Sequence, residues 1–275
     1  MSIINQIEQV DLSKNNAIDN LKKLYGSLGK RLCFQIEIPA NCHFYRFVSS
    51  NGSGNVHDKD YLKYKPSHLN TIPQRASLAN QTVFYGTISN NLSSETPDSI
   101  NQAVWIGAAE TSPNYRDCII QNTYTDSKET FILSKWTNKK DIYLDAIVHP
   151  SVFPLSNNDF LSAIKSEYNK CISKVSDINA KTNAELVAEF FAKKFQNRVS
   201  SDDEYKITAL FADMLMSFPQ SDGVIYPSVM VEGKFGMCVA IKPNVVDNSF
   251  DLECVKDVNV ILDSKKKEFS VVDCK

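Results

Sequence analysis

The chain has 275 residues, of which 43% are hydrophobic, and its 30 basic and 32 acidic side chains leave a net charge of −2. This length and apolar share predict a folded protein with a sizeable core and argue against a disordered chain. Neither half of the chain is strongly basic, so the electrostatic footprint of a nucleic-acid-binding protein is missing. We expect no nucleic-acid partner.

The sequence also indicates a compartment. Its N-terminus has no basic leader, and no window approaches the roughly 18 apolar residues that a spanning helix requires. The cysteines are scattered without a CxxC pair, which favours free thiols in a reducing compartment; they stand at positions 33, 42, 118, 171, 238, 254 and 274. We expect a soluble, cytoplasmic protein without membrane association.

No metal site is predicted. Cys42 and His43 are adjacent, but neighbours on a strand point to opposite faces of a sheet, so this pair does not suit one ion.

The first elements in chain order are a helix and then strands. Residues 14–28 have an amphipathic pattern, with Ser13 as the expected N-cap. Period-two alternation predicts strands at 33–38, 43–48 and 81–88. Residues 49–80 between them carry Ser, Asn, Gly and Pro without periodicity, and a loop of this length is usually functional or mobile.

Residues 103–110 form a buried segment for which helix and strand both remain open at this length. Further strands are predicted at 130–136 and 142–148, followed by a helical stretch over 159–216 in three pieces, with Asn183 and Ser201 as caps. Strands return at 223–227, 236–242, 249–255, 257–262 and 268–272. Because strands stand on both sides of the helical middle, they must share one or two sheets around it, and we predict a single α+β domain.

The segment from Asp222 to Ser228 is the most informative stretch. It begins with an Asp-Gly turn signal, continues with three β-prone residues and ends in Pro-Ser. Since Pro227 lacks a backbone donor, we expect strand pairing to end there and Ser228 to lie at the sheet edge. Read alone, the segment is also typical of a surface strand with an ordinary ST-turn.

Other polar residues stand beside predicted strands. Arg46 lies within a half-buried strand, where a guanidinium is costly unless it faces an anion or forms a structural ion pair. Arg75 ends the long loop and would by itself be a surface arginine, and Glu110 ends a small apolar run, where a cap or an ion-paired residue is common. The dinucleotide, P-loop, zincin and hydrolase motifs GxGxxG, GxxxxGK[ST], HExxH and GxSxG are absent.

Taken in order, these pieces resemble the RES domain, a family named for its arginine, glutamate and serine. The resemblance covers about residues 43–245, with 1–42 as an N-terminal extension of one helix and a first strand, and 246–275 as C-terminal strands packed on the same domain. It is carried by Phe44-Tyr45-Arg46, Gln74-Arg75-Ala76-Ser77, Val83-Phe84-Tyr85, Ala108-Ala109-Glu110 and the stretch from Asp222 to Ser228.

The resemblance implies an ADP-ribosyltransferase-like fold, with a mixed sheet core and a helical middle segment, that uses NAD⁺ as substrate and needs no metal. Relatives cleave the nicotinamide–ribose bond by hydrolysis or phosphorolysis, or transfer ADP-ribose to a protein. A catalytically silent module that binds a nucleotide or a partner is the remaining alternative. Members of the family are toxins of toxin–antitoxin pairs, so the resemblance also implies a possible antitoxin protein as partner. Whether the protein forms an oligomer stays open.

The resemblance assigns roles to five residues. Arg46 and Arg75 would hold the pyrophosphate, because a planar guanidinium suits phosphate oxygens. Tyr85 and Ser228 would pack against and orient the nicotinamide and its ribose, and Glu110 would stabilise the positive charge that develops on the ribose.

Two features depart from the family pattern. Gln74-Arg75-Ala76-Ser77 replaces the usual Gly-Arg-Trp/Phe-Asn context, and the glutamate comes 25 residues after the tyrosine. Glu95, ten residues after Tyr85, is therefore an alternative carboxylate, although its setting resembles a turn. Because the sequence places no base such as a histidine near Ser228, we expect this hydroxyl to position NAD⁺ and not to attack it.

Overall fold

The computed structural model describes residues 2–28, 34–50, 57–89, 96–112, 114–115, 118, 123, 125–152, 159–228, 236–266 and 268–274. Nine strands form one sheet: β1 (Gln35–Ile38), β2 (His43–Ser49), β3 (Phe84–Ile88), β4 (Ser127–Asn138), β5 (Ile142–Ala146), β6 (Gly223–Pro227), β7 (Met237–Ile241), β8 (Phe250–Asp263) and β9 (Glu268–Asp273). Their order is β1-β5-β6-β7-β3-β2-β4-β8-β9. Among the described pairs, β5 and β6 alone run parallel, so the sheet is mixed and mostly antiparallel.

Eight α-helices belong to the described part of the chain: α1 (Ile3–Glu8), α2 (Ala17–Gly26), α3 (Lys59–Lys63), α4 (Pro97–Thr111), α6 (Asp159–Ser173), α7 (Ile178–Gln196), α8 (Tyr205–Met216) and α9 (Pro243–Ser249). Short 3₁₀ turns are η1 (Ser67–Leu69), η2 (Pro150–Val152) and η3 (Asp202–Glu204). None of the described helices has both the length and the apolarity to cross a bilayer. The α+β class predicted from the sequence is confirmed.

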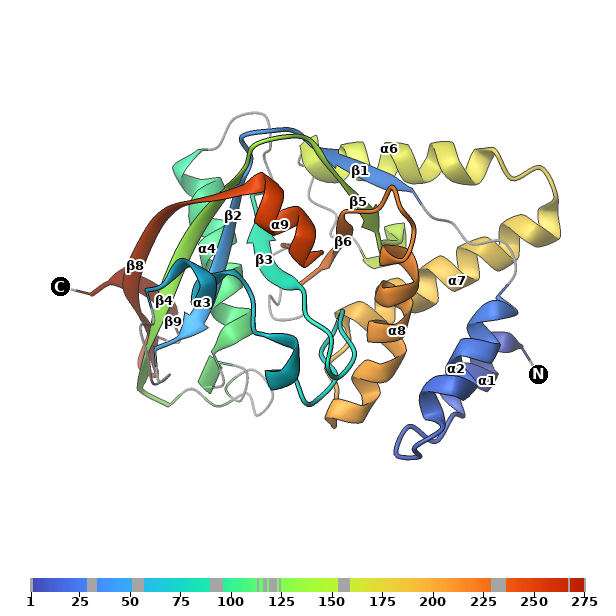
Figure 1. Ribbon diagram of the computed structural model, residues 1–275, viewed down its shortest axis with the longest axis horizontal. Coiled ribbons are helices and arrows are strands. Elements are labelled where there is room, and N and C mark those ends of the chain that lie inside the picture. The colour runs from blue at the N-terminus through green and yellow to red at the C-terminus, as the bar shows by residue number, and fades with distance from the viewer. Residues whose placement is uncertain are drawn as a thin grey trace.

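Helices cover both faces of the sheet (Figure 1). The side chains of β7 point alternately to the two faces of the sheet and show which helices cover each face. Met237, Val239 and Ile241 point into a core shared with α6 and α9, whereas Cys238 and Ala240 point to the side of α7 and α8. A strand covered on both faces is a continuous apolar run, as β7 is.

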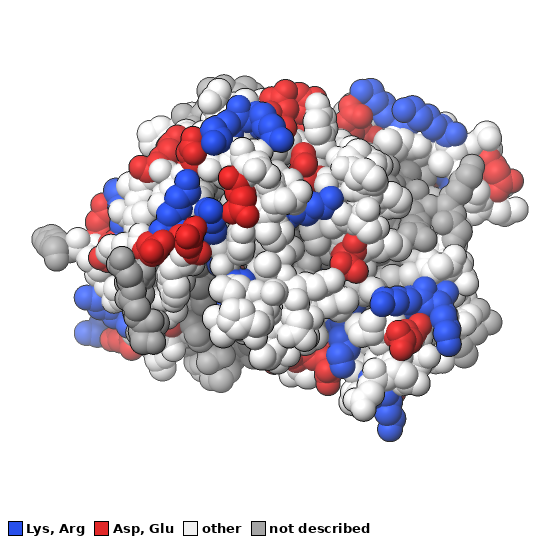
Figure 2. Space-filling view, in the orientation of Figure 1, with Lys and Arg blue, Asp and Glu red and all other residues white. Residues whose placement is uncertain are grey.

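The two ends of the chain join the same sheet. At one end β1 pairs with β5, and at the other β8 pairs with both β4 and β9. The N-terminal α2 packs on α8, where the Tyr25 hydroxyl donates to the Ile207 carbonyl at 2.8 Å. Acidic and basic side chains are interspersed on the face shown in Figure 2, in keeping with the small net charge.

Two of the three predicted helix caps are wrong. Helix α2 begins after Asn16, and Ser13 instead bonds to the Asp11 side chain. Helix α7 begins earlier than expected: the Asp177 carboxylate accepts from the Ala180 amide at 2.7 Å, and Asn183 lies inside the helix. Ser201 does cap a helical segment, η3, but without a side-chain hydrogen bond.

The segment 103–110, left open between helix and strand, is the C-terminal half of α4. This helix starts with a capping box between Thr96 and Ser99 and has Pro97 in its first turn, two signals that precede the buried run.

The separate strands predicted at 249–255 and 257–262 form one strand, β8, which pairs with the long β4 across a register shift between Lys135 and Trp136. The helices α1, α3 and α9 were not predicted, and α3 and η1 lie within the expected loop.

A buried carboxylate on β5 makes stability depend on pH. Asp145 is 5% exposed, and its Oδ2 has no hydrogen-bond partner among the described residues. Burial raises the pKa of this carboxyl, although the nearby polar side chains of Ser221 and Gln35 oppose the shift. A carboxyl with a raised pKa in the folded state favours folding while protonated, so its contribution is lost as pH rises above the unfolded value of about 3.9.

We therefore expect Asp145→Asn to gain stability relative to wild type as pH rises. The difference in unfolding free energy between the two proteins should be more favourable to the variant at pH 7 than at pH 4, measured by urea unfolding across this range. A difference that stays constant with pH would contradict the assignment.

Candidate functional site

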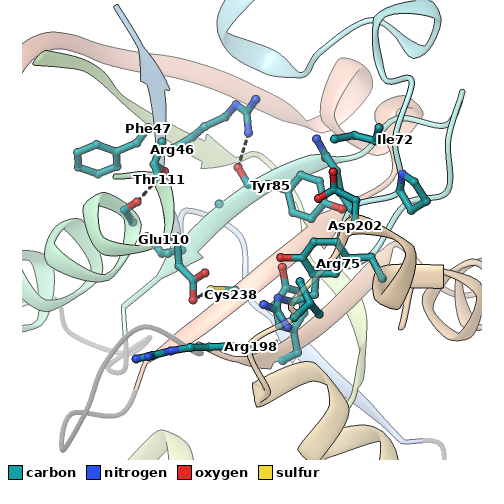
Figure 3. A pocket seen from close by; sticks show the side chains of 18 of the residues that line it. Arg46, Phe47, Ile72, Arg75, Tyr85, Glu110, Thr111, Arg198, Asp202 and Cys238 are labelled. Atoms are coloured by element: carbon teal, nitrogen blue, oxygen red, sulfur yellow. Dashed lines mark hydrogen bonds between the residues drawn. The ribbon is translucent and has the colours of Figure 1, made fainter. Parts of the chain in front are cut away.

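A cavity of about 450 Å³ lies where α4, β2 and β3 meet the turn at residues 72–75 and the segment 198–205 (Figure 3). Arg46, Arg75, Tyr85 and Glu110 all line it. Ser228 contacts Glu110 from the end of β6. The structure thus brings the five residues expected from the sequence to one place, although they come from five separate parts of the chain.

Arg46 projects from β2 and is held by backbone carbonyls. Its Nε donates to the Leu62 carbonyl at 3.0 Å and its Nη1 to the Tyr85 carbonyl at 2.9 Å, and its guanidinium lies 5.7 Å from the centre of the Phe84 ring. Burial lowers its pKa to about 10, so it remains charged at neutral pH. Among the described residues, no carboxylate pairs with Arg46 and no acceptor bonds to its Nη2.

Arg75 is anchored in a similar way at the C-terminal end of α7. Its Nη1 donates to the carbonyls of Phe195 at 2.6 Å and Asn197 at 3.1 Å, and its guanidinium lies 5.3 Å from the centre of the Tyr205 ring. The edge formed by Nε and Nη2 bonds to none of the described residues. Arg75 is therefore a partly buried residue that joins its turn to the C-terminal end of α7, unlike the plain surface arginine that its position alone suggested.

The Tyr85 hydroxyl is engaged within the protein. It accepts from the Ala76 amide at 3.0 Å and shares a hydrogen bond with the Ser77 hydroxyl at 3.1 Å, and burial raises its pKa to about 12. These bonds brace the bridge between Gln74 and Ser77. Tyr85 consequently offers the cavity its ring, whereas its hydroxyl, which we expected to orient a ligand, fixes the turn that carries Arg75.

Glu110 lies in the last turn of α4, and the Ser228 hydroxyl donates to its Oε1. The Cys238 thiol lies 3.8 Å from the same oxygen. The end of a helix carries negative partial charge, which disfavours a carboxylate there by about 0.3–1 kcal/mol, and this last turn contains no basic residue. A position that breaks a local rule in this way is typical of a functional residue.

The close approach of α4 to the sheet depends on Gly107. A Cβ at this position would lie 2.8 Å from Cδ2 of Phe47 and 3.2 Å from the Thr87 hydroxyl. Thr87 uses that hydroxyl to donate to the Ala103 carbonyl of the same helix at 2.7 Å. The missing side chain lets α4 lie directly on β2 and β3, and this places Glu110 beside Ser228.

Strand β6 ends at Pro227, as expected, but one further backbone hydrogen bond to the segment before β7 follows it. Pro227 stands opposite Met237, and the Ser228 amide still donates to the Gly236 carbonyl at 2.8 Å. In an antiparallel pair, bonded and non-bonded residues alternate, so Pro227 occupies a position that needs no amide bond to β7. The ladder itself therefore positions the serine backbone.

Two further expectations concern carboxylates. The sequence placed no base near Ser228, whereas the structure puts the Glu110 carboxylate there as acceptor. Glu95, the alternative carboxylate, lies outside the described residues.

Sequence reasoning missed several residues that line the cavity, among them Arg198, Tyr205, Tyr226 and Cys238. Arg198 had a usable signal. Only five of the 30 basic residues are arginines, at positions 31, 46, 75, 116 and 198, and three of these line this cavity, whereas no lysine is among its described lining residues.

A scan against protein-family models gave no match to the chain, and a comparison with curated protein sequences gave none either.

The bonds of Arg75 predict a stability difference between two arginines of the same cavity. We expect Arg75→Ala to lower the unfolding free energy by about 1–3 kcal/mol, because the carbonyl of the buried Phe195 loses its charged donor. Arg198→Ala is the matched control: this exposed side chain bonds to no described residue, so a change within about 0.5 kcal/mol is expected. Urea unfolding measures both, and equal losses would contradict the structural role of Arg75.

Proposed function

We propose that this protein consumes NAD⁺ by cleaving its nicotinamide–ribose bond. The observation that carries the proposal is the Glu110–Ser228 pair, which adjoins a cavity that two carbonyl-anchored arginines also line. The resemblance of the ordered motifs to the RES domain supports the same activity and an ADP-ribosyltransferase-like arrangement of the mixed sheet.

The proposed chemistry explains why a carboxylate stands where α4 ends. Neutral nicotinamide leaves with the bonding electron pair, and positive charge develops on the ribose as in glycoside cleavage. A fixed negative charge at Glu110 stabilises this transition state without reorganisation. Water, phosphate or a protein nucleophile then bonds to the ribose carbon and releases a proton.

Ser228 serves this step through Glu110. Its hydroxyl donates to Oε1 and so fixes the direction of the carboxylate, while its amide bond to Gly236 holds the backbone. A hydroxyl that donates to a carboxylate is a positioning group, in line with the expectation that Ser228 does not attack NAD⁺.

Arg46 and Arg75 supply cations for the pyrophosphate. Each uses part of its guanidinium on backbone carbonyls. Arg46 donates from Nε and Nη1 and leaves only Nη2 unbonded to described residues, whereas Arg75 donates from Nη1 alone and leaves the edge formed by Nε and Nη2 unbonded to them. Such an edge matches two oxygens of a phosphate, and its orientation is set before the ligand arrives.

The activity is tested by incubating the purified protein with NAD⁺, with and without phosphate. We expect release of nicotinamide, measured by chromatography. The NAD⁺ is labelled in its adenylate half to distinguish the three reactions. Labelled ADP-ribose would indicate hydrolysis, and labelled phosphorylated ADP-ribose would indicate phosphorolysis. Label on a protein band, after lysate is added, would indicate transfer to a protein. A folded protein that releases no nicotinamide in any of these conditions would contradict the proposal.

Removal of the Glu110 charge tests the role of the carboxylate. We expect Glu110→Gln to lower turnover by roughly 10²–10³, the usual cost of deleting one electrostatic stabiliser. Glu167→Gln is the control, because this surface glutamate on α6 pairs with Lys170 and does not line the cavity. If Glu110→Gln keeps wild-type turnover, another carboxylate has this role.

A further inference from the structure

The cavity holds more positive charge than the proposed roles of Arg46 and Arg75 use. Arg198 also lines it, from the segment that follows α7. No ion pair joins any of these three arginines to a carboxylate of the described residues. Glu110 and Asp202 are also among the described lining residues, so three arginines against two carboxylates leave a net charge of +1. A concave site with excess positive charge attracts an anion.

The three arginines differ in how they are held. Arg46 and Arg75 donate to backbone carbonyls, which fix the orientation of each guanidinium. Arg198 is exposed and makes no hydrogen bond or ion pair with any described residue. All five of its N–H donors are therefore available to a ligand.

The backbone on both sides of Arg198 is nevertheless anchored. On one side the Asn197 carbonyl accepts from Arg75 at 3.1 Å. On the other side the Ser200 amide donates to the Glu204 carboxylate at 3.0 Å. Arg198 thus projects from a fixed base, which suits a side chain that orders on ligand binding.

The position of Arg198 complements that of Arg46. In Figure 3 the Arg198 side chain extends beneath Glu110 and Cys238, whereas Arg46 lies above Glu110. A ligand whose sugar lies beside Glu110 would therefore have a guanidinium on either side of it.

From these observations, and resting on the proposed function for the identity of the ligand, we propose that Arg198 is a substrate-binding residue that contacts the phosphates of a nucleoside diphosphate moiety. It adds a third guanidinium to the two that are fixed. Because its contact is to the phosphates and not to the reacting ribose carbon, it binds the ground state and the transition state equally. Its loss then raises KM and leaves kcat nearly unchanged.

Calorimetric titration of ADP and ADP-ribose into the full-length chain tests this assignment without requiring turnover. We expect Arg198→Ala to weaken ADP binding about tenfold to hundredfold, which corresponds to the loss of one hydrogen-bonded charge contact. Arg198→Lys should be intermediate, because it keeps the charge and loses the fork. Lys140→Ala removes one positive charge from an exposed turn outside the cavity and should bind ADP as wild type does.

Salt and the phosphate-free ligand adenosine provide internal controls. Wild-type affinity for ADP should fall as salt is raised, and that of Arg198→Ala should fall less steeply, because fewer charge contacts remain to be screened. Adenosine should bind all four proteins alike. The assignment is overturned if Arg198→Ala binds ADP as tightly as wild type, or if wild type does not bind ADP.

Parallel assays of NAD⁺ cleavage separate this inference from the proposed function. Cleavage by Arg198→Ala with wild-type KM would overturn the role of Arg198 and leave the proposed activity standing. A different pair of results is that Arg198→Ala loses ADP binding while the wild-type protein binds ADP but releases no nicotinamide. These results would support the phosphate site and contradict the proposed reaction.

Discussion

The contact of α4 with β2 and β3 is the constraint on which the candidate site depends. It is possible because Gly107 has no side chain, so that the helix lies against Phe47 and Thr87. The approach brings the last turn of α4 to the end of β6, where Glu110 accepts from Ser228. A carboxylate at the negative end of a helix dipole is unfavourable, and the stability of a core that buries both faces of the central strands offsets this free energy.

The polar groups of the cavity differ in how many of their hydrogen bonds are made within the protein. Arg46, Arg75 and Tyr85 use part of their hydrogen-bonding capacity on the protein itself, which fixes the geometry of the walls. The Ser228 hydroxyl orients the Glu110 carboxylate, and Arg198 donates to none of the described residues. Within the described part of the chain, Arg198 is thus a cation without a partner on a rigid frame, and ligand binding would order its side chain.

Local signals in the sequence were sufficient for the class of the fold and for most elements. Period-two alternation located the strands at 35–38, 43–49 and 84–88 to within a few residues, and the apolar spacing from Tyr205 to Leu215 matches α8. Predictions failed where the outcome depends on competition between neighbours. Asp177 replaced Asn183 as the cap of α7, and two short predicted strands merged into β8 because β8 pairs with β4 along the whole length of β4.

The sequence by itself determined the residue types of the candidate site, since Arg46, Arg75, Tyr85, Glu110 and Ser228 were selected by their settings beside predicted strands. Only the tertiary structure decided which of their atoms are available. The Tyr85 hydroxyl bonds to a turn nine residues before it in the chain, Arg75 to carbonyls 120 and 122 residues away, and Ser228 to a carboxylate 118 residues away. Arg198 joined the site in the same way, because hydrogen-bond partners and cavity walls are set by the packing of distant segments, which local periodicity does not encode.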